Sequence, residues 1–473
     1  MIDINLLRKN PAYVEEALAK RNFHVDLQEF LALDAKRREK IQQLEKLKAE
    51  KNQTSASIPV LKKEGKDISA VIEKGRALGD EIKAQEAGLQ EVQNEQDTFL
   101  AGLPNLPYDD VQAGGKEANR VVESYGDQPD FSYPAKDHVT LAESLGLIDY
   151  KRGAKLAGNG FWIYTGKGAQ LEWALLNYFV QTHLADGYEM LLPPHLLRYA
   201  CGFTAGQFPK FEEDVFWLED RADDWPDEEL GAEAGAQGSA KGGSKGANQK
   251  ETAEQEGATH GQNVRLANRQ FLLPTAETAL VNLYRDEILA EADLPKKFFA
   301  FTPCYRREAG SYRAEERGMI RGHQFNKVEL FQYCLPDQGL SALDELVKKA
   351  VSLVTGLGLH CRLSALAAGD VSATMRKTLD IEVYIPSMQG YKEVSSASWA
   401  GDYQARRGMM RYRDGAGKVQ FLHTLNASGL ATSRIFPALL EQGQNEDGSV
   451  NIPEVLQAYM GGQTRLEPIA KGK

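Results

Sequence analysis

Residues 304–329 read CYRREAGSYRAEERGMIRGHQFNKVE, and this stretch holds the densest cluster of polar and charged side chains in the chain. Strand-like segments flank a charged loop, so the pattern predicts a hairpin that gathers several guanidinium groups at one end of a sheet. Arginine forks match phosphate oxygens through paired hydrogen bonds, and aromatic faces can stack on a purine. On composition alone a salt-bridged surface hairpin explains the stretch at least as well, so a phosphate site is one of two interpretations.

Outward from this hairpin, helical and strand-like segments alternate irregularly. The strand-like segments are residues 188–192, 270–273, 327–333 and 380–384. This irregular order favours an antiparallel or mixed sheet with helices over a repeated βαβ unit, so the predicted fold class is α+β. Neither Gly-x-Gly-x-x-Gly nor Gly-x-x-x-x-Gly-Lys-Ser/Thr occurs in the chain. Any nucleotide site must therefore be built without those glycine-rich loops.

Two long polar segments precede the sheet region. We expect helices at about 26–56 and 68–100, separated by a break at 57–67 that contains Pro59 and Gly65. A narrow apolar stripe in each helix predicts an antiparallel coiled-coil arm. The stripe residues are Leu31, Ile41, Leu44, Leu47, Val71, Ile72, Leu78, Ile82, Leu89, Val92 and Phe99.

The arm also carries many basic side chains: Lys36, Arg37, Arg38, Lys40, Lys46, Lys48, Lys51, Lys62 and Lys63. They could follow a phosphate backbone, although basic residues on a coiled coil are more often solvated or paired within it. Two prolines in residues 102–107 end the second helix. The sequence thus predicts an N-terminal domain of residues 1–110, with its arm at about 26–100, and a second domain of residues 111–473.

The bulk composition is that of a globular protein, with 42% hydrophobic and 26% charged residues and no apolar run long enough to cross a bilayer. No secretory pattern opens the chain, so the expected location is cytoplasmic and no membrane partner is expected. The four cysteines lack metal-ligand spacing, so no zinc is expected. A net charge of −11 argues against a nucleic-acid partner, but acidic residues are concentrated in residues 221–263. That polar, Gly- and Ser-rich stretch predicts a disordered low-complexity insertion without chemistry.

Residues 304–329 resemble the second signature motif of class II aminoacyl-tRNA synthetases, in the form found in seryl-tRNA synthetases. The stretch GYEMLLPP at 187–194 resembles the first motif, a dimer-forming helix and strand, and LNASGLATSR at 425–434 resembles the third. PTAE at 274–277 is similar to a serine-binding segment of the family, and 393–407, which contains EVSS and DYQARR, to its ATP and magnesium strand. With the helical arm, the resemblance spans nearly the whole chain apart from the insertion.

The resemblance implies a class II catalytic domain with an antiparallel sheet and an N-terminal tRNA-binding arm. It implies a serine–tRNA ligase, an ATP-dependent aminoacyl-tRNA ligase that activates L-serine to seryl-adenylate and esterifies it onto tRNA(Ser), and onto tRNA(Sec) as well. It also implies Mg²⁺ as a cofactor and a homodimer in which the arm crosses the long variable arm of a tRNA bound to the other subunit. The serine carboxylate attacks the α-phosphorus and no protein nucleophile is needed, so positioning and charge neutralisation supply the catalysis.

The resemblance also assigns roles to residues. Arg306 and Arg434 are expected to be catalytic, Glu393 and Ser396 to ligate Mg²⁺, Arg321 to hold the terminal phosphate, Phe325 to stack on adenine and Glu308 to read its amino group. The complete expected ATP-binding set is Arg306, Arg307, Glu308, Arg321, Gly322, Phe325, Glu393, Val394, Ser395, Ser396 and Arg434. The expected serine-binding set is Thr275, Ala276, Glu277, Arg306, Glu329, Asn426 and Ser428.

Two departures from the family pattern stand out. Ser398-Trp399-Ala400 occupies a place where Ser-Asn-Cys is common, so local packing beside the ATP strand should differ. The tip of the charged loop, residues 312–316 with Arg313-Ala314, also departs from the usual pattern and leaves transfer to tRNA more open than activation. Two other interpretations therefore remain: a catalytically altered paralogue that acts as an RNA-binding or regulatory protein, and an aminoacyl donor for another acceptor or a drug-resistance duplicate.

Overall fold

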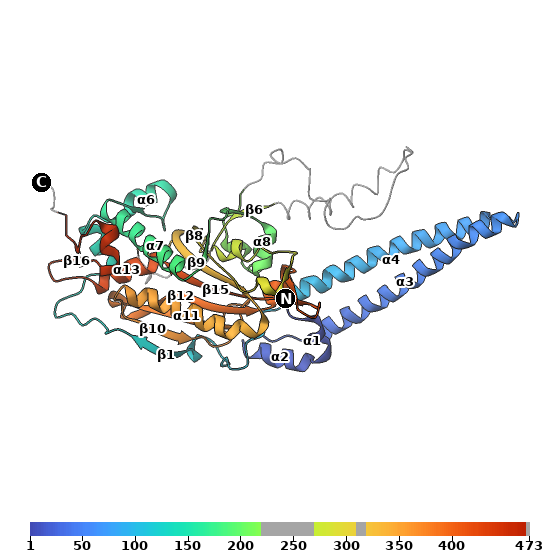
Figure 1. The fold of residues 1–473 in the computed structure, drawn as a ribbon, viewed down its shortest axis with the longest axis horizontal. Coiled ribbons are helices and arrows are strands. Elements are labelled where there is room, and N and C mark those ends of the chain that lie inside the picture. Colours follow the sequence, from blue (N-terminus) through green and yellow to red (C-terminus); the bar gives the residue numbers. More distant parts are fainter. Residues whose placement is uncertain (219–268, 309–317, 470–473) are drawn as a thin grey trace.

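A computed structural model describes residues 1–218, 269–308 and 318–469. The predicted insertion at 221–263 and the loop tip at 312–316 lie outside the described residues. Figure 1 shows a body built around a large sheet, from which a pair of long helices projects. In the part of the chain that the structure describes, no helix is both long enough and apolar enough to cross a membrane.

The projecting arm consists of α3 (Gln28–Lys63) and α4 (Ser69–Gly102), which run antiparallel (Figure 1). Leu44, Leu78, Ile82 and Val92 are buried between the two helices, as the apolar stripe predicts. Ile72 was expected in the same stripe but is 53% exposed. The reason is the helical period. Residues three, four or seven positions before Leu78 lie on its face of the helix, whereas Ile72, six positions before it, lies on another face.

The predicted break at 57–67 is wrong in its first half, because α3 continues through Pro59 to Lys63. A proline inside a helix removes one intrahelical hydrogen bond and crowds the preceding turn. Here Pro59 is exposed and lies in the last turns of the helix, where packing against α4 sustains the helical backbone. The turn between the helices is therefore shorter than the sequence pattern indicates.

A small helical base joins the arm to the body. It contains α1 (Ile4–Lys9) and α2 (Pro11–Ala19), and its core includes Leu7, Leu18 and Phe30. Asp34 of α3 is fully buried there and accepts two hydrogen bonds from the Arg8 guanidinium, at 2.6 and 2.9 Å. Because a buried carboxylate needs such donors, this pair ties the root of the arm to α1.

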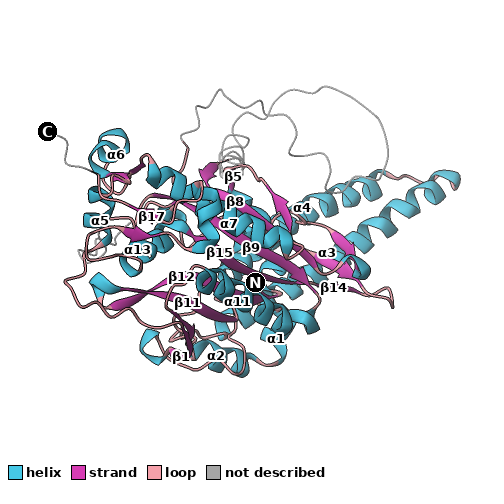
Figure 2. Ribbon diagram, turned by 60° about the vertical axis from the view of Figure 1, so that its left-hand side comes forward, coloured by secondary structure: helices cyan, strands magenta, loops and turns pink. Residues whose placement is uncertain are grey.

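The body is built on one eight-stranded sheet, and Figure 2 shows its long strands running between helices. In sheet order the strands are β1 (Arg120–Tyr125), β10 (Cys361–Ala365), β11 (Lys377–Ile385), β12 (Gly390–Gly401), β15 (His423–Ala431), β9 (Gln324–Cys334), β8 (Lys296–Tyr305) and β4 (Glu189–Leu191). Every neighbouring pair is antiparallel except β4 and β8. The α+β expectation, an antiparallel class II sheet with a helical arm, is confirmed.

Three helices cover one face of this sheet: α7 (Lys167–Ala185), α11 (Gly339–Gly356) and α13 (Thr432–Gln442). They meet the apolar side chains that alternate along the strands, so the main core lies on this face. The other α-helices in the described part of the chain are α5 (His138–Ser144), α6 (Tyr150–Ala157), α8 (Tyr199–Ala205), α10 (Glu277–Leu280), α12 (Tyr403–Arg407) and α14 (Glu454–Gln457). The short strands are β2 (Ile148–Asp149), β3 (Ile163–Tyr164), β5 (Leu196–Arg198), β6 (Gln270–Leu272), β7 (Ile288–Ala290), β13 (Arg411–Arg413), β14 (Val419–Phe421), β16 (Val450–Asn451) and β17 (Arg465–Leu466).

Trp399 occupies the helix-covered face of β12. Its buried ring packs against Gly339 at the start of α11, where an added Cβ would lie 2.5 Å from the indole. Tyr108 lies beside it, with ring centres 5.2 Å apart. The unusual tryptophan is thus accommodated by a glycine on the far side of the sheet from Ser398, which lines the cavity described below.

Candidate active site

A polar cavity of about 540 Å³ opens on the face of the sheet opposite α7, α11 and α13. This volume is in the range of about 300–1,000 Å³ that is usual for small-molecule sites. Its lining includes ten of the residues that the sequence predicts: Thr275, Glu277, Arg306, Glu308, Arg321, Glu329, Glu393, Ser396, Asn426 and Ser428. These residues span 153 positions of the chain, from Thr275 to Ser428, and meet in one cavity.

Strand periodicity explains most of the lining. Alternate residues of a strand point to the same face, which places Lys327 and Glu329 of β9 in the cavity together. Asn426 and Ser428 of the neighbouring β15 follow the same rule. Ser428 pairs directly with Glu329 across the two strands.

Glu393 and Ser396 of β12 do not follow this rule, because side chains three residues apart on a regular strand point to opposite faces. The register with β11 explains why both line the cavity. Glu382 of β11 pairs with Glu393, and the residue before it, Ile381, pairs with Ser395. Val394 lies between the two paired residues of β12 and has no partner of its own in β11, so it is one extra residue in β12. This β-bulge restores Ser396 to the face that carries Glu393.

One end of the cavity is rich in buried carboxyl and amide groups. Asn426 Nδ2 donates to Glu329 Oε1 at 2.9 Å and to Glu277 Oε2 at 3.2 Å. Lys327 Nζ lies 2.6 Å from Glu329 Oε2, with both side chains almost completely buried. Gln404 of α12 donates to Glu277 Oε1 at 2.8 Å. This end can accept hydrogen bonds from an ammonium or a hydroxyl group of a ligand.

Burial, reinforced by the nearby negative charge of Glu329, raises the pKa of Glu277 to about 7. The reverse holds for Glu393, where the Arg434, Arg306 and Lys327 cations together outweigh the effect of burial and hold the pKa below its usual value. Asp380 lies beside Glu393; burial first and the Glu393 charge second raise its pKa well above the usual value. Neighbouring cations thus favour the ionised form of Glu393, whereas burial and a neighbouring carboxylate favour the protonated form of Glu277.

The other end of the cavity is cationic. The Arg306 Nε atom donates to the Pro274 carbonyl oxygen at 3.2 Å, and its guanidinium carbon lies 5.2 Å from the centre of the Phe325 ring. Arg434 Nη1 donates to the Glu393 carbonyl oxygen at 2.6 Å and lies 3.2 Å from the Glu393 carboxylate.

Arg321 and Glu308 meet at 2.5 Å and both line the cavity. Glu308 lies three residues after the end of β8 and adopts a positive φ of 50°. Guanidinium groups at this end match phosphate oxygens, and an aromatic ring such as that of the half-buried Phe325 can stack on a purine.

Several predicted residues lie outside the cavity lining. Ala276, Val394 and Ser395 are buried behind it, and Ser395 Oγ donates to the Ser428 carbonyl oxygen at 2.7 Å. Arg307 donates through its backbone N–H to Asp214, and Gly322 packs against the Trp162 ring. Phe325 and Arg434 border the cavity only through their contacts with Arg306 and Glu393.

The structure also brings in residues that sequence reasoning missed. Lys327, Gln404 and Asp380 contact predicted site residues, and Gln207 and Thr374 line the cavity. Alternation along β9 could have identified Lys327, which lies two residues from both Phe325 and Glu329.

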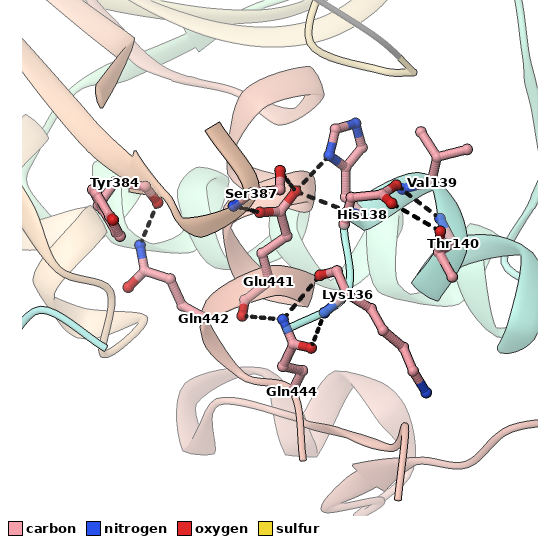
Figure 3. A network of polar contacts seen from close by, with 10 residues as sticks. Lys136, His138, Val139, Thr140, Tyr384, Ser387, Glu441, Gln442 and Gln444 are labelled. Carbon is pink, nitrogen blue, oxygen red and sulfur yellow. Dashed lines mark hydrogen bonds and ion pairs between the residues drawn. The ribbon is translucent and has the colours of Figure 1, made fainter. Parts of the chain in front are cut away.

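The helix that carries Arg434 is fixed at its far end by a buried polar network (Figure 3). Glu441 of α13 is fully buried, and its Oε1 accepts a hydrogen bond from Ser387 Oγ at 2.8 Å. The same oxygen lies 2.7 Å from His138 Nδ1, while Oε2 accepts from the Ser387 backbone N–H at 2.8 Å. A carboxylate with this many donors fixes α13 to α5 and to the β11–β12 connection.

The antiparallel sheet, the cationic hairpin end and the arginine at the start of α13 define the catalytic core of a class II aminoacyl-tRNA synthetase. Family models agree: residues 263–443 match the tRNA synthetase class II core domain (G, H, P, S and T), and residues 1–107 match the seryl-tRNA synthetase N-terminal domain. The chain belongs to the seryl-tRNA synthetase family.

Its relatives match over nearly their whole length. Serine–tRNA ligase 2 of Clostridium acetobutylicum is 53% identical, covering 98% of this chain and 99% of the relative. Serine–tRNA ligase of Nitratidesulfovibrio vulgaris (strain Hildenborough) is 40% identical, covering 98% of this chain and 100% of the relative. The crystal structure of seryl-tRNA synthetase from Pyrococcus horikoshii complexed with ATP matches with a TM-score of 0.83 at 28% identity, covering 99% of this chain and 100% of that one.

Proposed function

We propose that this chain activates L-serine with ATP to form seryl-adenylate and transfers the seryl group to tRNA(Ser). The observation that carries the proposal is the division of one cavity into an end with Glu277, Glu329 and Asn426 and an end with Arg306 and Arg321, which Arg434 borders through Glu393. An amino acid and a nucleotide can occupy these ends with the carboxylate of one beside the α-phosphate of the other.

In this mechanism no side chain forms a covalent bond to substrate. An oxygen of the serine carboxylate attacks the α-phosphorus, and the bond to the pyrophosphate leaving group breaks. Arg306 is suited to bridge the carboxylate and the α-phosphate, because it lies between the Pro274 turn and the Phe325 ring. Holding both reactants in one orientation and neutralising the developing charge account for the rate enhancement.

Serine recognition rests on the carboxyl end of the cavity. We assign the ammonium group to Glu277 and Thr275, and the hydroxyl group to Glu329 with Asn426 and Ser428 nearby. Glu329 is completely buried, so a ligand without the hydroxyl would leave its polar environment unsatisfied. Such a mismatch discriminates strongly against alanine, whereas an apolar pocket separates similar side chains only weakly.

Mg²⁺ fits the oxygen atoms of Glu393 and Ser396. Glu393 is kept ionised by its cationic neighbours, and the bulge turns both side chains to the same cavity. Among the described residues no group of three or more His, Cys, Asp or Glu side chains is placed to hold a metal ion. That suits an ion that takes only one or two protein ligands and completes its shell with water and nucleotide phosphates. Bound there, Mg²⁺ would neutralise phosphate charge.

We further propose a homodimer whose interface includes α7 and the β4–β5 region. Trp173, Leu192 and Leu196 are 59%, 76% and 43% exposed there, which is unusual for large apolar side chains. The arm would then reach a tRNA bound to the partner subunit. Its exposed Lys36, Lys46, Lys62 and Lys63 are available for phosphate contacts, which select by shape and backbone rather than by base sequence.

The same recognition by shape would admit tRNA(Sec), and the expected setting for these reactions is the cytoplasm. We also propose the division into domains of residues 1–110 and 111–473, because α4 ends at Gly102 and the first strand of the large sheet begins at Arg120.

The deciding experiment is serine-dependent exchange of pyrophosphate with ATP, with alanine, threonine and cysteine as competing amino acids, followed by charging of tRNA with the same preparation. Serine-selective exchange together with charging supports the proposal. Exchange without charging favours a different acceptor, and the absence of exchange favours an RNA-binding or regulatory paralogue. A duplicate with altered inhibitor sensitivity would exchange normally and differ only in its response to inhibitors.

A further inference from the structure

Glu172 of α7 is a buried carboxyl group with no part in the mechanism above. Its side chain is 3% exposed, yet it lies on the helix whose next residue, Trp173, is largely exposed. Glu172 Oε1 accepts a hydrogen bond from Thr432 Oγ1 at 2.6 Å and another from Asn326 Nδ2 at 2.8 Å. One oxygen atom therefore joins three elements: α7, β9 and α13.

Both donors lie beside residues of the ATP end of the cavity. Asn326 is the residue of β9 between Phe325 and Lys327. Thr432 is the first residue of α13, two positions before Arg434, and Ala431 at the N-cap offers no side-chain hydrogen bond to the helix. The contact with Glu172 thus fixes the start of the helix that directs Arg434 towards Glu393, while Glu441 fixes the opposite end of the same helix (Figure 3).

We propose that Glu172 is a positioning residue for ATP, which holds Asn326 and Thr432 so that Phe325 and Arg434 keep a fixed mutual arrangement. The inference rests on the proposed function, because it assigns ATP to this end of the cavity. It needs no contact between Glu172 and the nucleotide: the carboxyl group acts by accepting these two hydrogen bonds. Removing it takes this acceptor from Asn326 Nδ2 and leaves Thr432 Oγ1 with its longer contact to the Asn326 carbonyl oxygen, at 3.1 Å, which favours local rearrangement.

The state of the carboxyl group agrees with this role. Burial raises the pKa of Glu172 to about 7, while the hydrogen bonds from Thr432 and Asn326 oppose that shift. The protonated and the ionised carboxyl group both present an acceptor oxygen to the two donors, so the proposed role rests on the geometry of that oxygen. Glutamine offers the same acceptor oxygen at the same distance along the side chain, so it is the conservative replacement.

The test compares Glu172→Ala, Glu172→Gln and Leu175→Ala. Leu175 is a fully buried residue of the same helix and serves as the matched control for lost packing without lost polar contact. The measurements are the ATP dissociation constant by calorimetry, the KM values for ATP and serine in the exchange reaction, and the thermal midpoint of each variant. Calorimetry keeps the test independent of whether the chain activates serine.

For Glu172→Ala we expect ATP binding to weaken and the KM for ATP to rise by about five- to tenfold, with the KM for serine within about twofold of wild type. Glu172→Gln should stay within about twofold of wild type in both, and Leu175→Ala should lower the thermal midpoint without a selective effect on ATP. The inference is overturned if Glu172→Ala loses no more ATP affinity than Leu175→Ala, or if glutamine is as defective as alanine.

A double-mutant cycle provides a second check if Glu172→Ala folds poorly. Thr432→Val removes the hydroxyl donor and keeps the shape of the side chain. Glu172→Met removes the acceptor oxygen and keeps most of the side-chain volume; if one hydrogen-bonded unit positions the ATP end, the effects of Glu172→Met and Thr432→Val on the ATP dissociation constant will not add. Additive effects would contradict the proposed unit. A further outcome is a wild type that binds ATP in a Glu172-dependent way and yet shows no serine-dependent exchange. That result would contradict the proposed function and would still support this inference.

Discussion

Charged side chains have different consequences in the arm and in the cavity. In the arm, Lys48 and Glu86 meet at 2.8 Å with about half of each side chain exposed. In the cavity, Lys327 and Glu329 meet at 2.6 Å and are almost completely buried. An exposed pair contributes about 0–1 kcal/mol and can be replaced singly, whereas breaking a buried pair leaves an uncompensated charge. The arm therefore tolerates local change, and the cavity depends on each member of its network.

The largest effect should come from the cationic end of the cavity. Arg306→Ala removes the guanidinium group between Pro274 and Phe325, and we expect serine-dependent exchange to fall by about 10³-fold. The control is Arg152→Ala, because Arg152 is an exposed arginine paired only with Asp149 on the surface and its loss should leave the rate unchanged. Exchange rates within tenfold of wild type for Arg306→Ala would contradict the assigned role.

Shortening the arm should separate the two regions. Replacing residues 41–87 by a short glycine-rich turn joins Lys40 to Gly88, which already lie together across the two helices. We expect tRNA charging to fall by about 100-fold while exchange stays within about twofold, because the arm provides the phosphate contacts in our proposal and none of its residues lines the cavity. Equal losses in both reactions would mean that the arm also supports the fold of the body.

The acidity of Glu277 gives a smaller, pH-dependent effect. Its pKa is raised to about 7, so lowering the pH adds a proton and removes the charge that the serine ammonium needs. The KM for serine should therefore rise below pH 7, approaching about tenfold per pH unit, and Glu277→Gln should abolish this dependence. A KM for serine that is flat between about pH 5.5 and pH 8, a range that spans this pKa, would contradict the assignment.

The same raised pKa has a defined effect on stability. The folded chain binds a proton more tightly at Glu277 than the unfolded chain does, so this group's contribution to the free energy of unfolding is present in full below the ordinary pKa of 4.5. It is lost as the pH rises towards about 7.

The smallest predicted effect lies in the arm itself. A methyl group added at Gly75 of α4 would meet no atom within 4 Å, so Gly75→Ala should stabilise the helix by about 0.5–1 kcal/mol. Slower amide hydrogen exchange in residues of α4 would report it, with aminoacylation unchanged. Faster amide hydrogen exchange in α4 would contradict this prediction.

Patterns that are local in the chain were sufficient to predict the arm and the α+β class, and the resemblance to a family predicted ten of the 22 residues that line the cavity. The charged hairpin and the residues near Glu277 and Asn426 could be identified because the relevant side chains lie within short motifs. The path of α3 through Pro59 could not, because packing against α4 outweighs the preference of a single residue. Nor could the contact between Glu172 and Thr432, which are 260 positions apart. Such contacts depend on how helices are placed on the sheet.

The extra residue at Val394 makes the length of β12 part of its chemistry. Deleting Val394 would remove the bulge and leave Glu393 and Ser396 two positions apart on a regular strand, still on one face but without the local kink and added twist that set their present separation. A deletion in a regular part of β12 has no extra residue to absorb it, so it would turn every following side chain to the opposite face, whereas a substitution changes one position. Between Glu393 and Ser396, the bulge is therefore what allows a change in residue count to keep the two oxygen-bearing side chains together.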